Sequence, residues 1–167
     1  MSLEGTVEAE NLSNDLWRER DVLDNLLYKF TTQRLLVSNG ESRWLGRCTA
    51  EIETLKDQLA TTQLAVDVHS AALAEKWGLH TGAAPTLREL VEAAPVDGPW
   101  AEMLGDHHAN ILRIAESIRS TSEENLRILK VANISLQDGG QAPTPVTYTA
   151  TGAAAHHSGA ALVDRAG

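Results

Sequence analysis

The sequence predicts an all-α fold: a long antiparallel, coiled-coil-like helical hairpin, a third long helix packed along it, and a disordered C-terminal tail. Apolar residues recur at helical spacing from Asn11 to Val37, and again from Leu45 to Leu73. Ser38-Asn39-Gly40 joins the two stripes by a short turn, which favours antiparallel packing of the helices. From Gly139 onward Gly, Ala, Thr and Pro dominate, and no periodic apolar pattern persists.

The first helix is expected over residues 11–38. Its apolar residues keep to one side, and Asn39-Gly40 supplies the left-handed conformation that closes a helix. Residues 1–10 are acidic and lack a periodic face, so they are expected to fray. The N-cap candidates are Ser13, Asn14 and Asp15.

The second helix is expected over residues 41–77, with Gly78 as its stop. Its apolar face advances in steps of three and four, which is the heptad spacing of paired helices. The residues on this seam are Leu45, Cys48, Ile52, Leu55, Leu59, Thr62, Val66, His69 and Leu73. Such a seam indicates that the helix works by packing against another helix.

Glycine and proline punctuate residues 79–99, and a third long helix follows. Thr86 and Glu89 have the spacing of a capping box, which predicts a short helix over 87–94. Pro99 suits the first turn of a helix over 100–138. The apolar face of that helix consists of Leu104, Ile111, Ala115, Ile118, Leu126, Leu129, Ala132 and Leu136. Ser122 and Asn125 interrupt the face near its middle, which suggests looser packing there.

The expected domain organisation is a helical bundle over residues 1–138 and a flexible Gly/Ala/Pro-rich tail over 139–167. The net charge of −9 and the pI near 5.1 weigh against binding to nucleic acid or to anionic membrane surfaces. Cys48 is the single cysteine, so no disulfide can form within the chain. No apolar run has the length of a membrane span, and a cytoplasmic location without membrane insertion is expected.

The sequence carries no recognisable catalytic centre, and neither an enzyme, a cofactor nor a metal is expected. His107 and His108 are adjacent, so on a helix they point in different directions and do not easily bind one ion. Cys48 lies on the apolar seam, where packing is the expected role. A histidine-phosphotransfer bundle would use an exposed His69 or His107, but the run after His69 lacks the Lys-Gly of such sites. A seam histidine that fixes helix register is the competing interpretation of His69.

A three-helix assembly with an unfilled groove can accept an amphipathic helix from a partner protein. The candidate contact residues are Ile118, Leu126, Leu129, Ala132 and Leu136 of the third helix, and Tyr148, Leu162 and Val163 of the tail. Two alternatives stay open. The third helix completes the bundle by itself, or two chains pair, as in a structural coiled-coil adaptor or homodimer.

Several segments of the chain resemble the FlgN family, in the version found in actinobacterial flagellar systems. The residues that carry the resemblance are Leu16-Trp17-Arg18-Glu19-Arg20, Leu23, Leu26, Lys29-Phe30, Gly40-Glu41-Ser42-Arg43-Trp44-Leu45, Pro85-Thr86-Leu87-Arg88-Glu89-Leu90, Pro99-Trp100, Thr147-Tyr148 and Leu162-Val163-Asp164-Arg165. They cover nearly the whole chain. The combination is more specific than any single segment, because helical hairpins converge easily.

FlgN proteins are small, helical, cytoplasmic export chaperones. The resemblance implies that this chain binds the C-terminal amphipathic helices of the flagellar hook-associated proteins that form the hook–filament junction. It would keep them unassembled and deliver them to the type III export apparatus. The family offers no invariant active residues, so the candidate contact residues come from the apolar stripes alone.

Overall fold

The computed structural model contains four α-helices in the residues that it describes, which are 5–80, 83–138, 147–148 and 154–155. The helices are α1 (Thr6–Ser38), α2 (Ser42–Lys76), α3 (Leu87–Ala93) and α4 (Trp100–Asp138). Two short strands, β1 (Thr147–Tyr148) and β2 (Ala154–Ala155), pair antiparallel. The predicted all-α class, the hairpin and the third long helix are confirmed.

The chain divides into two compact units, Met1–Leu129 and Lys130–Gly167. The first unit holds α1, α2, α3 and most of α4. The second unit holds the end of α4 and the β1–β2 pair, which the sequence pattern did not predict. The remaining residues of the predicted tail lie outside the described residues, and the predicted boundary at 138/139 stays a prediction.

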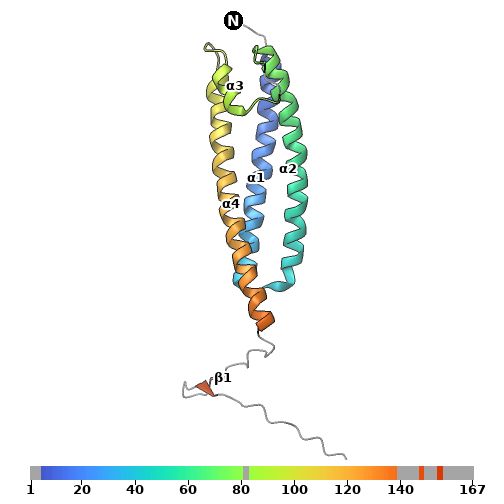
Figure 1. Ribbon diagram of the computed structural model, residues 1–167, viewed down its shortest axis with the longest axis vertical. Coiled ribbons are helices and arrows are strands. Elements are labelled where there is room, and N and C mark those ends of the chain that lie inside the picture. The colour runs from blue at the N-terminus through green and yellow to red at the C-terminus, as the bar shows by residue number, and fades with distance from the viewer. Residues whose placement is uncertain (1–4, 81–82, 139–146, 149–153, 156–167) are drawn as a thin grey trace, which may run out of the picture. The chain divides into compact units, whose positions relative to one another are not determined.

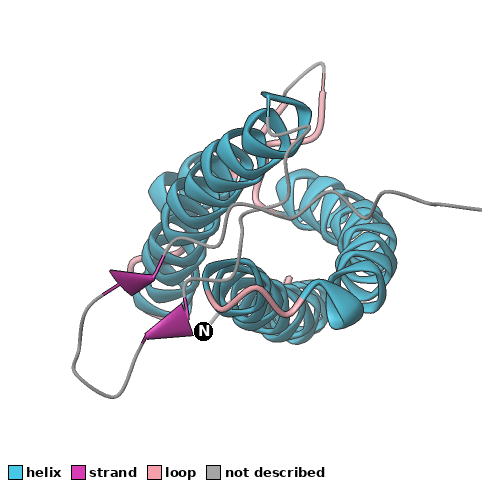
Figure 2. Cartoon of the chain, turned by 90° about the horizontal axis from the view of Figure 1, so that it is seen from below, coloured by secondary structure: helices cyan, strands magenta, loops and turns pink. Residues whose placement is uncertain are grey.

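In the first unit α1 lies between α2 and α4 (Figure 1). The end-on view in Figure 2 shows these helices as neighbouring rods. Ser13 contacts Met103 near the start of both helices, and Phe30 contacts Asn125 further along, so α4 runs parallel to α1. Helix α1 therefore packs against both other long helices.

The first helix begins at Thr6, five residues before the predicted start, and the expected fraying of residues 1–10 is wrong for its described part. Gly5 caps the helix with φ of +89°, and a Cβ atom there would lie 2.8 Å from Trp77 Nε1. Ala9 is fully buried in the core. The extra turn forms because Trp77 and the end of α2 cover it. Ser13 is consequently an interior helical residue and caps nothing.

The three predicted punctuation signals are confirmed. After α1 the amide of Gly40 donates to Val37 O and that of Glu41 donates to Leu36 O, which together make a Schellman motif. Gly40 has φ of +70° and Gly78 has φ of +73°, and the same pair of bonds recurs at the end of α2. Thr86 and Glu89 form both bonds of the capping box that begins α3.

Two hydrophobic clusters hold the first unit together. One joins all four helices and consists of Ala9, Leu12, Leu16, Leu73, Ala74, Leu90 and Leu104. The other lies toward the hairpin turn, where Leu26, Cys48 and Ile52 are buried and Ile118 packs against them. No residue of the predicted α2 seam is exposed, so that seam is confirmed.

The face that α4 buries differs from the predicted one. Its fully buried residues share one heptad register with four half-buried ones: Leu104, His107, Ile111, Ile114, Ile118, Thr121, Asn125 and Ile128. Ala115, Leu126 and Ala132, which were placed on this face, are exposed. The error arose because only apolar positions were counted, whereas the buried register includes the polar His107 and Asn125.

The expected looser packing at Asn125 is also wrong. Asn125 is 1% exposed, and its Nδ2 donates to Phe30 O at 2.8 Å and to Gln33 Oε1 at 2.9 Å. Gln33 in turn donates through Nε2 to Thr49 Oγ1 of α2 at 3.3 Å. This polar layer links all three long helices, so it fixes their register as buried amides do in coiled coils.

Candidate functional site

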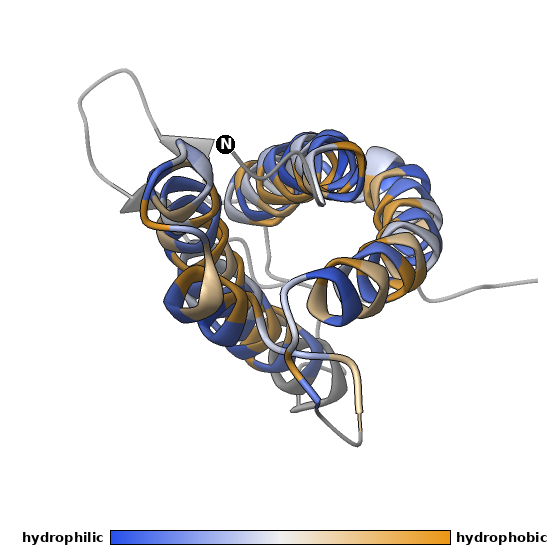
Figure 3. Cartoon of the chain, turned by 90° about the horizontal axis from the view of Figure 1, so that it is seen from above, coloured by the Kyte–Doolittle hydropathy of each residue, from blue (hydrophilic) through white to orange (hydrophobic). Residues whose placement is uncertain are grey.

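Part of the apolar face predicted for α4 belongs to a separate, largely exposed stripe of that helix, which we call the α4 flank. Its members keep heptad spacing one residue further along the sequence than the buried register, so they lie roughly 100° further round the helix. They are Leu112, Ala115, Arg119, Ser122, Leu126 and Leu129. Leu112 is 56% exposed and Leu126 is 60% exposed, while Leu129 is half-buried. Hydrophobic segments coloured orange and hydrophilic ones coloured blue alternate around the long helices in Figure 3.

The charge in the middle of the α4 flank is neutralised within the helix. Arg119 Nη2 lies 2.7 Å from Glu116 Oε1, and its Nη1 lies 3.1 Å from Glu123 Oε1. These pairs hold the guanidinium along the helix surface. Such exposed pairs contribute little to stability. An apolar surface that docks on the α4 flank would therefore contact Leu112 and Leu126 on either side of Arg119, whose charge is already paired.

The predicted contact residues fall in three places. Leu126 and Leu129 belong to the α4 flank, whereas Ile118 packs against the buried cluster of Leu26, Cys48 and Ile52. Ala132 is exposed and Leu136 lies in α4. Tyr148 lies in β1, and Leu162 and Val163 lie outside the described residues. Leu112 was missed, although its distance of two heptads from Leu126 was a signal in the sequence.

His107 sits in a buried cluster at the α1–α4 contact. Its Nδ1 lies 3.4 Å from Arg20 Nη1 and its Nε2 lies 3.3 Å from Ser13 Oγ, while Trp17 meets the ring edge-on. Because arginine can only donate, Nδ1 is the acceptor and Nε2 carries the proton that is donated to Ser13 Oγ. Ser13 donates onward to Met103 Sδ at 3.3 Å. The imidazole therefore cannot act as a base toward this hydroxyl.

The environment of His107 also opposes a second positive charge. Burial, and then the nearby Arg20 guanidinium, lower the pKa of this imidazole, against a smaller opposing effect of Asp106. His107 is 1% exposed, so a phosphoryl donor does not reach it in this conformation. The adjacent His108 is half-buried. His107 is therefore a packing residue of the α1–α4 contact.

His69 Nδ1 hydrogen-bonds the buried carboxylate of Asp15 across the hairpin, and Arg18 bonds the other oxygen of that carboxylate at 3.0 Å. The contact links the α2 seam to α1, in agreement with a role in register. Cys48 is buried, and burial raises the pKa of its thiol. A protonated, covered thiol is a poor nucleophile.

Glu19 is a buried acidic residue of α1 that faces α2. It is 7% exposed, and its Oε1 accepts a long bond of 3.4 Å from Gln63 Nε2 of α2. Burial raises the pKa of Glu19, the bond from Gln63 lowers it by less, and the charge of Asp67 raises it further. Among the described residues no cation forms an ion pair with this carboxylate.

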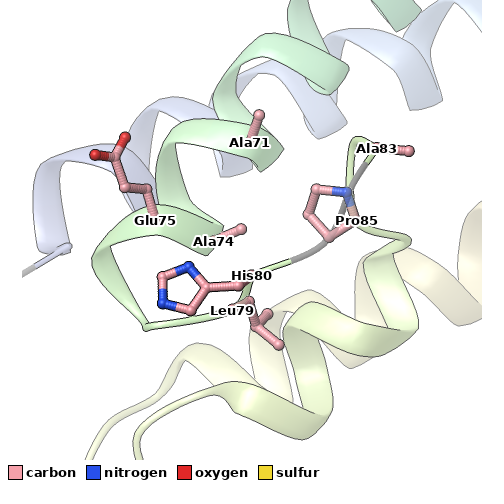
Figure 4. A pocket seen from close by; sticks show the side chains of 7 residues that line it. All are labelled: Ala71, Ala74, Glu75, Leu79, His80, Ala83 and Pro85. Carbon is pink, nitrogen blue, oxygen red and sulfur yellow. The ribbon is translucent and has the colours of Figure 1, made fainter.

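Two hollows lie elsewhere on the first unit. One, of about 450 Å³, is lined by Ala71, Ala74, Glu75, Leu79, His80, Ala83 and Pro85. Figure 4 shows these mostly small, apolar side chains around the last turn of α2 and the segment before α3. The other, of about 510 Å³, is an open groove between Arg18 and Val22 of α1 and the Thr54–Thr62 stretch of α2, and its exposed lining is mostly apolar. Neither brings together a nucleophile, a base and a polarising group.

The searched part of the chain holds no group of three or more His, Cys, Asp or Glu residues that could bind a metal ion. Within the same residues, every helix is too short or too polar to span a bilayer. Comparisons with protein-family models, with curated proteins and with solved structures find no match to this chain.

Proposed function

We propose that this chain is a chaperone that binds an amphipathic helix of a client protein along the α4 flank. The observation that carries the proposal is the second heptad stripe of α4, whose Leu112 and Leu126 are more than half exposed. A heptad stripe is the pattern that one helix presents to another. The buried register of α4 packs against the α1–α2 hairpin, and a client helix would pack against the exposed stripe.

We further propose that the client is the C-terminal amphipathic helix of a flagellar hook–filament junction protein. Support for this identity comes from the resemblance to the FlgN family. On this proposal the chain works in the cytoplasm, keeps the junction proteins unassembled and brings them to the type III export apparatus. The resemblance suggests the identity of the client, and the α4 flank is the surface that we propose binds it.

The expected energetics follow from apolar burial. Covering an exposed leucine contributes roughly 1.5–3 kcal/mol before the costs of association are subtracted. Replacing Leu112 and Leu126 together by glutamine should therefore weaken binding by roughly a hundredfold or more. Both side chains are exposed, so the fold should tolerate the change.

The test is calorimetry with the purified chain and the C-terminal segment of a junction protein from the same cell. The matched control is Leu64→Gln with Val68→Gln, because these residues of α2 are 67% and 66% exposed and lie away from α4. The Leu112→Gln, Leu126→Gln variant should lose most of the affinity, and the control should keep it. A negative heat-capacity change should accompany binding. Equal affinity in both variants would place the client elsewhere.

A structural coiled-coil dimer is the second candidate, and exposed Leu64 and Val68 favour it because they lie one helical turn apart on α2. Self-association through this pair would appear in sedimentation equilibrium as a concentration-dependent mass. Leu64→Gln with Val68→Gln should then abolish the dimer. The same double variant thus serves as the control for client binding and as the test of pairing.

A further inference from the structure

We propose that Glu19 selects the client helix by forming an ion pair with a lysine or arginine on the client's apolar face. This inference rests on the proposed function, since it assumes that a helix docks beside α4. It adds the chemistry of recognition: the client carries one basic residue in the middle of an otherwise apolar stripe.

Contacts between α1 and α4 define the position of Glu19 along the bundle. The contacts Ser13–Met103 and Asn125–Phe30 bracket it on α1 and fix the register of the parallel α4. Interpolation between them places Glu19 level with about Ile111, next to Leu112, since parallel helices rise at the same rate per residue. Glu19 therefore lies at the height of the α4 flank.

Among the described residues, no cation neutralises the Glu19 carboxylate. The neighbouring cations bond other groups: Arg18 pairs with Asp15, and Arg20 lies against His107 and Trp17. On the other helices Lys56 pairs with Glu53, and Arg119 pairs with Glu116 and Glu123. Glu19 keeps only the long bond from Gln63. A buried carboxylate with one neutral donor is far from satisfied.

The Glu19 carboxylate is accessible to a side chain of the client. Among the described side chains only Asn125 Oδ1 is both buried and without a hydrogen-bond partner. Glu19 is 7% exposed, and no described residue bonds its Oε2, so this oxygen is available to a client side chain. Ala60 of α2 and Ala115 of α4, both exposed, leave room near this level of the bundle. Exposed Asp67 adds a second negative charge beside Gln63.

The long stem of a lysine suits such a site. Its methylenes can lie along Leu112 while the ammonium reaches a carboxylate at depth. The cation would neutralise Glu19 and offset the repulsion by Asp67. A client helix with leucine at the same position would bury Glu19 without a partner, so it would bind more weakly. The acidic residue thereby discriminates between otherwise similar amphipathic helices.

The probe is a pair of synthetic amphipathic peptides of about three heptads, with leucine on the apolar stripe. One peptide carries lysine at the central stripe position, and the other carries norleucine, which has the same stem without the ammonium group. Fluorescence anisotropy gives the dissociation constant of each peptide for the wild-type chain, for Glu19→Gln and for Asp24→Asn. Asp24 is exposed on α1, so its variant controls for the loss of one negative charge.

The wild-type chain and Asp24→Asn should bind the lysine peptide at least about tenfold more tightly than the norleucine peptide. Glu19→Gln should lose this preference and still bind the norleucine peptide. Equal binding of the two peptides to the wild-type chain, or a preference that survives in Glu19→Gln, would overturn the inference and leave Glu19 as a register-fixing partner of Gln63. Failure of both peptides to bind would count against the proposed docking surface itself. Melting curves establish that each variant is folded.

Discussion

Asn125 of α4 donates a hydrogen bond of 2.9 Å to Gln33 Oε1 of α1, and both side chains are buried. The two residues are 92 positions apart in the sequence, so the bond helps to fix the position of α4 on the hairpin. It also decides which stripe of α4 faces inward. Rotating α4 to bury Leu126 would withdraw Asn125 from Gln33 and from Phe30 O.

Replacing Asn125 by alanine should lower the free energy of unfolding by about 1–3 kcal/mol, because Gln33 Oε1 is left buried without its donor. Urea denaturation followed by circular dichroism measures the change. Asn25→Ala is the matched control, since Asn25 is exposed and bonds only the carbonyl of Asp21 on its own helix. Equal losses in the two variants would mean that the polar layer does not seat α4.

Gly5→Ala should destabilise the chain by about 1–3 kcal/mol. The substitution forces a Cβ into a residue with φ of +89° and brings it within 2.8 Å of Trp77 Nε1. Gly46→Ala is the control, because Gly46 lies inside α2 with nothing within 4 Å of an added Cβ. That variant should gain roughly 0.5–1 kcal/mol from helix propensity. Thermal unfolding compares them, and a stabilised Gly5→Ala would show that α1 does not start against Trp77.

The stability of the bundle should fall as the pH drops through about 6.5, and His107 should be a main cause. Burial and Arg20 lower the pKa of His107 in the folded chain, so the unfolded chain binds this proton more readily. The contribution of neutral His107 is complete above pH 6.5 and is lost progressively as the pH falls from there toward the folded pKa.

The check is the free energy of unfolding of wild type, His107→Gln and His108→Gln, measured between neutral and mildly acidic pH. Glutamine accepts from Arg20 and donates to Ser13 without titrating, so the pH dependence should flatten in His107→Gln only. A slope that is unchanged in His107→Gln would assign the acid sensitivity to other groups.

The sequence was a good guide where apolar spacing and turn chemistry act locally. The α2 seam, the glycine stops and the Thr86–Glu89 capping box all form as the residues indicate. The start of α1 escaped prediction because it depends on Trp77, which is distant in sequence and covers Gly5. Local signals cannot reveal a contact of this kind.

The candidate site was only partly predictable for a related reason. Counting apolar residues merged two stripes of α4, since Ile118 and Leu126 both fit a helical period. The buried register became visible only through the polar contacts of His107 and Asn125, which pair with residues of α1. Which stripe is left exposed is therefore a property of the assembled bundle.

Site-specific photocrosslinking tests the central claim most directly. A photoreactive phenylalanine analogue placed at Leu126 or Leu112 lies on the α4 flank, and the same analogue at Leu64 lies on α2, away from it. The proposal predicts crosslinks to the C-terminal helix of the junction protein from positions 126 and 112 and none above background from position 64. Crosslinking from Leu64 alone, or none from either flank position while the client remains bound, would contradict it.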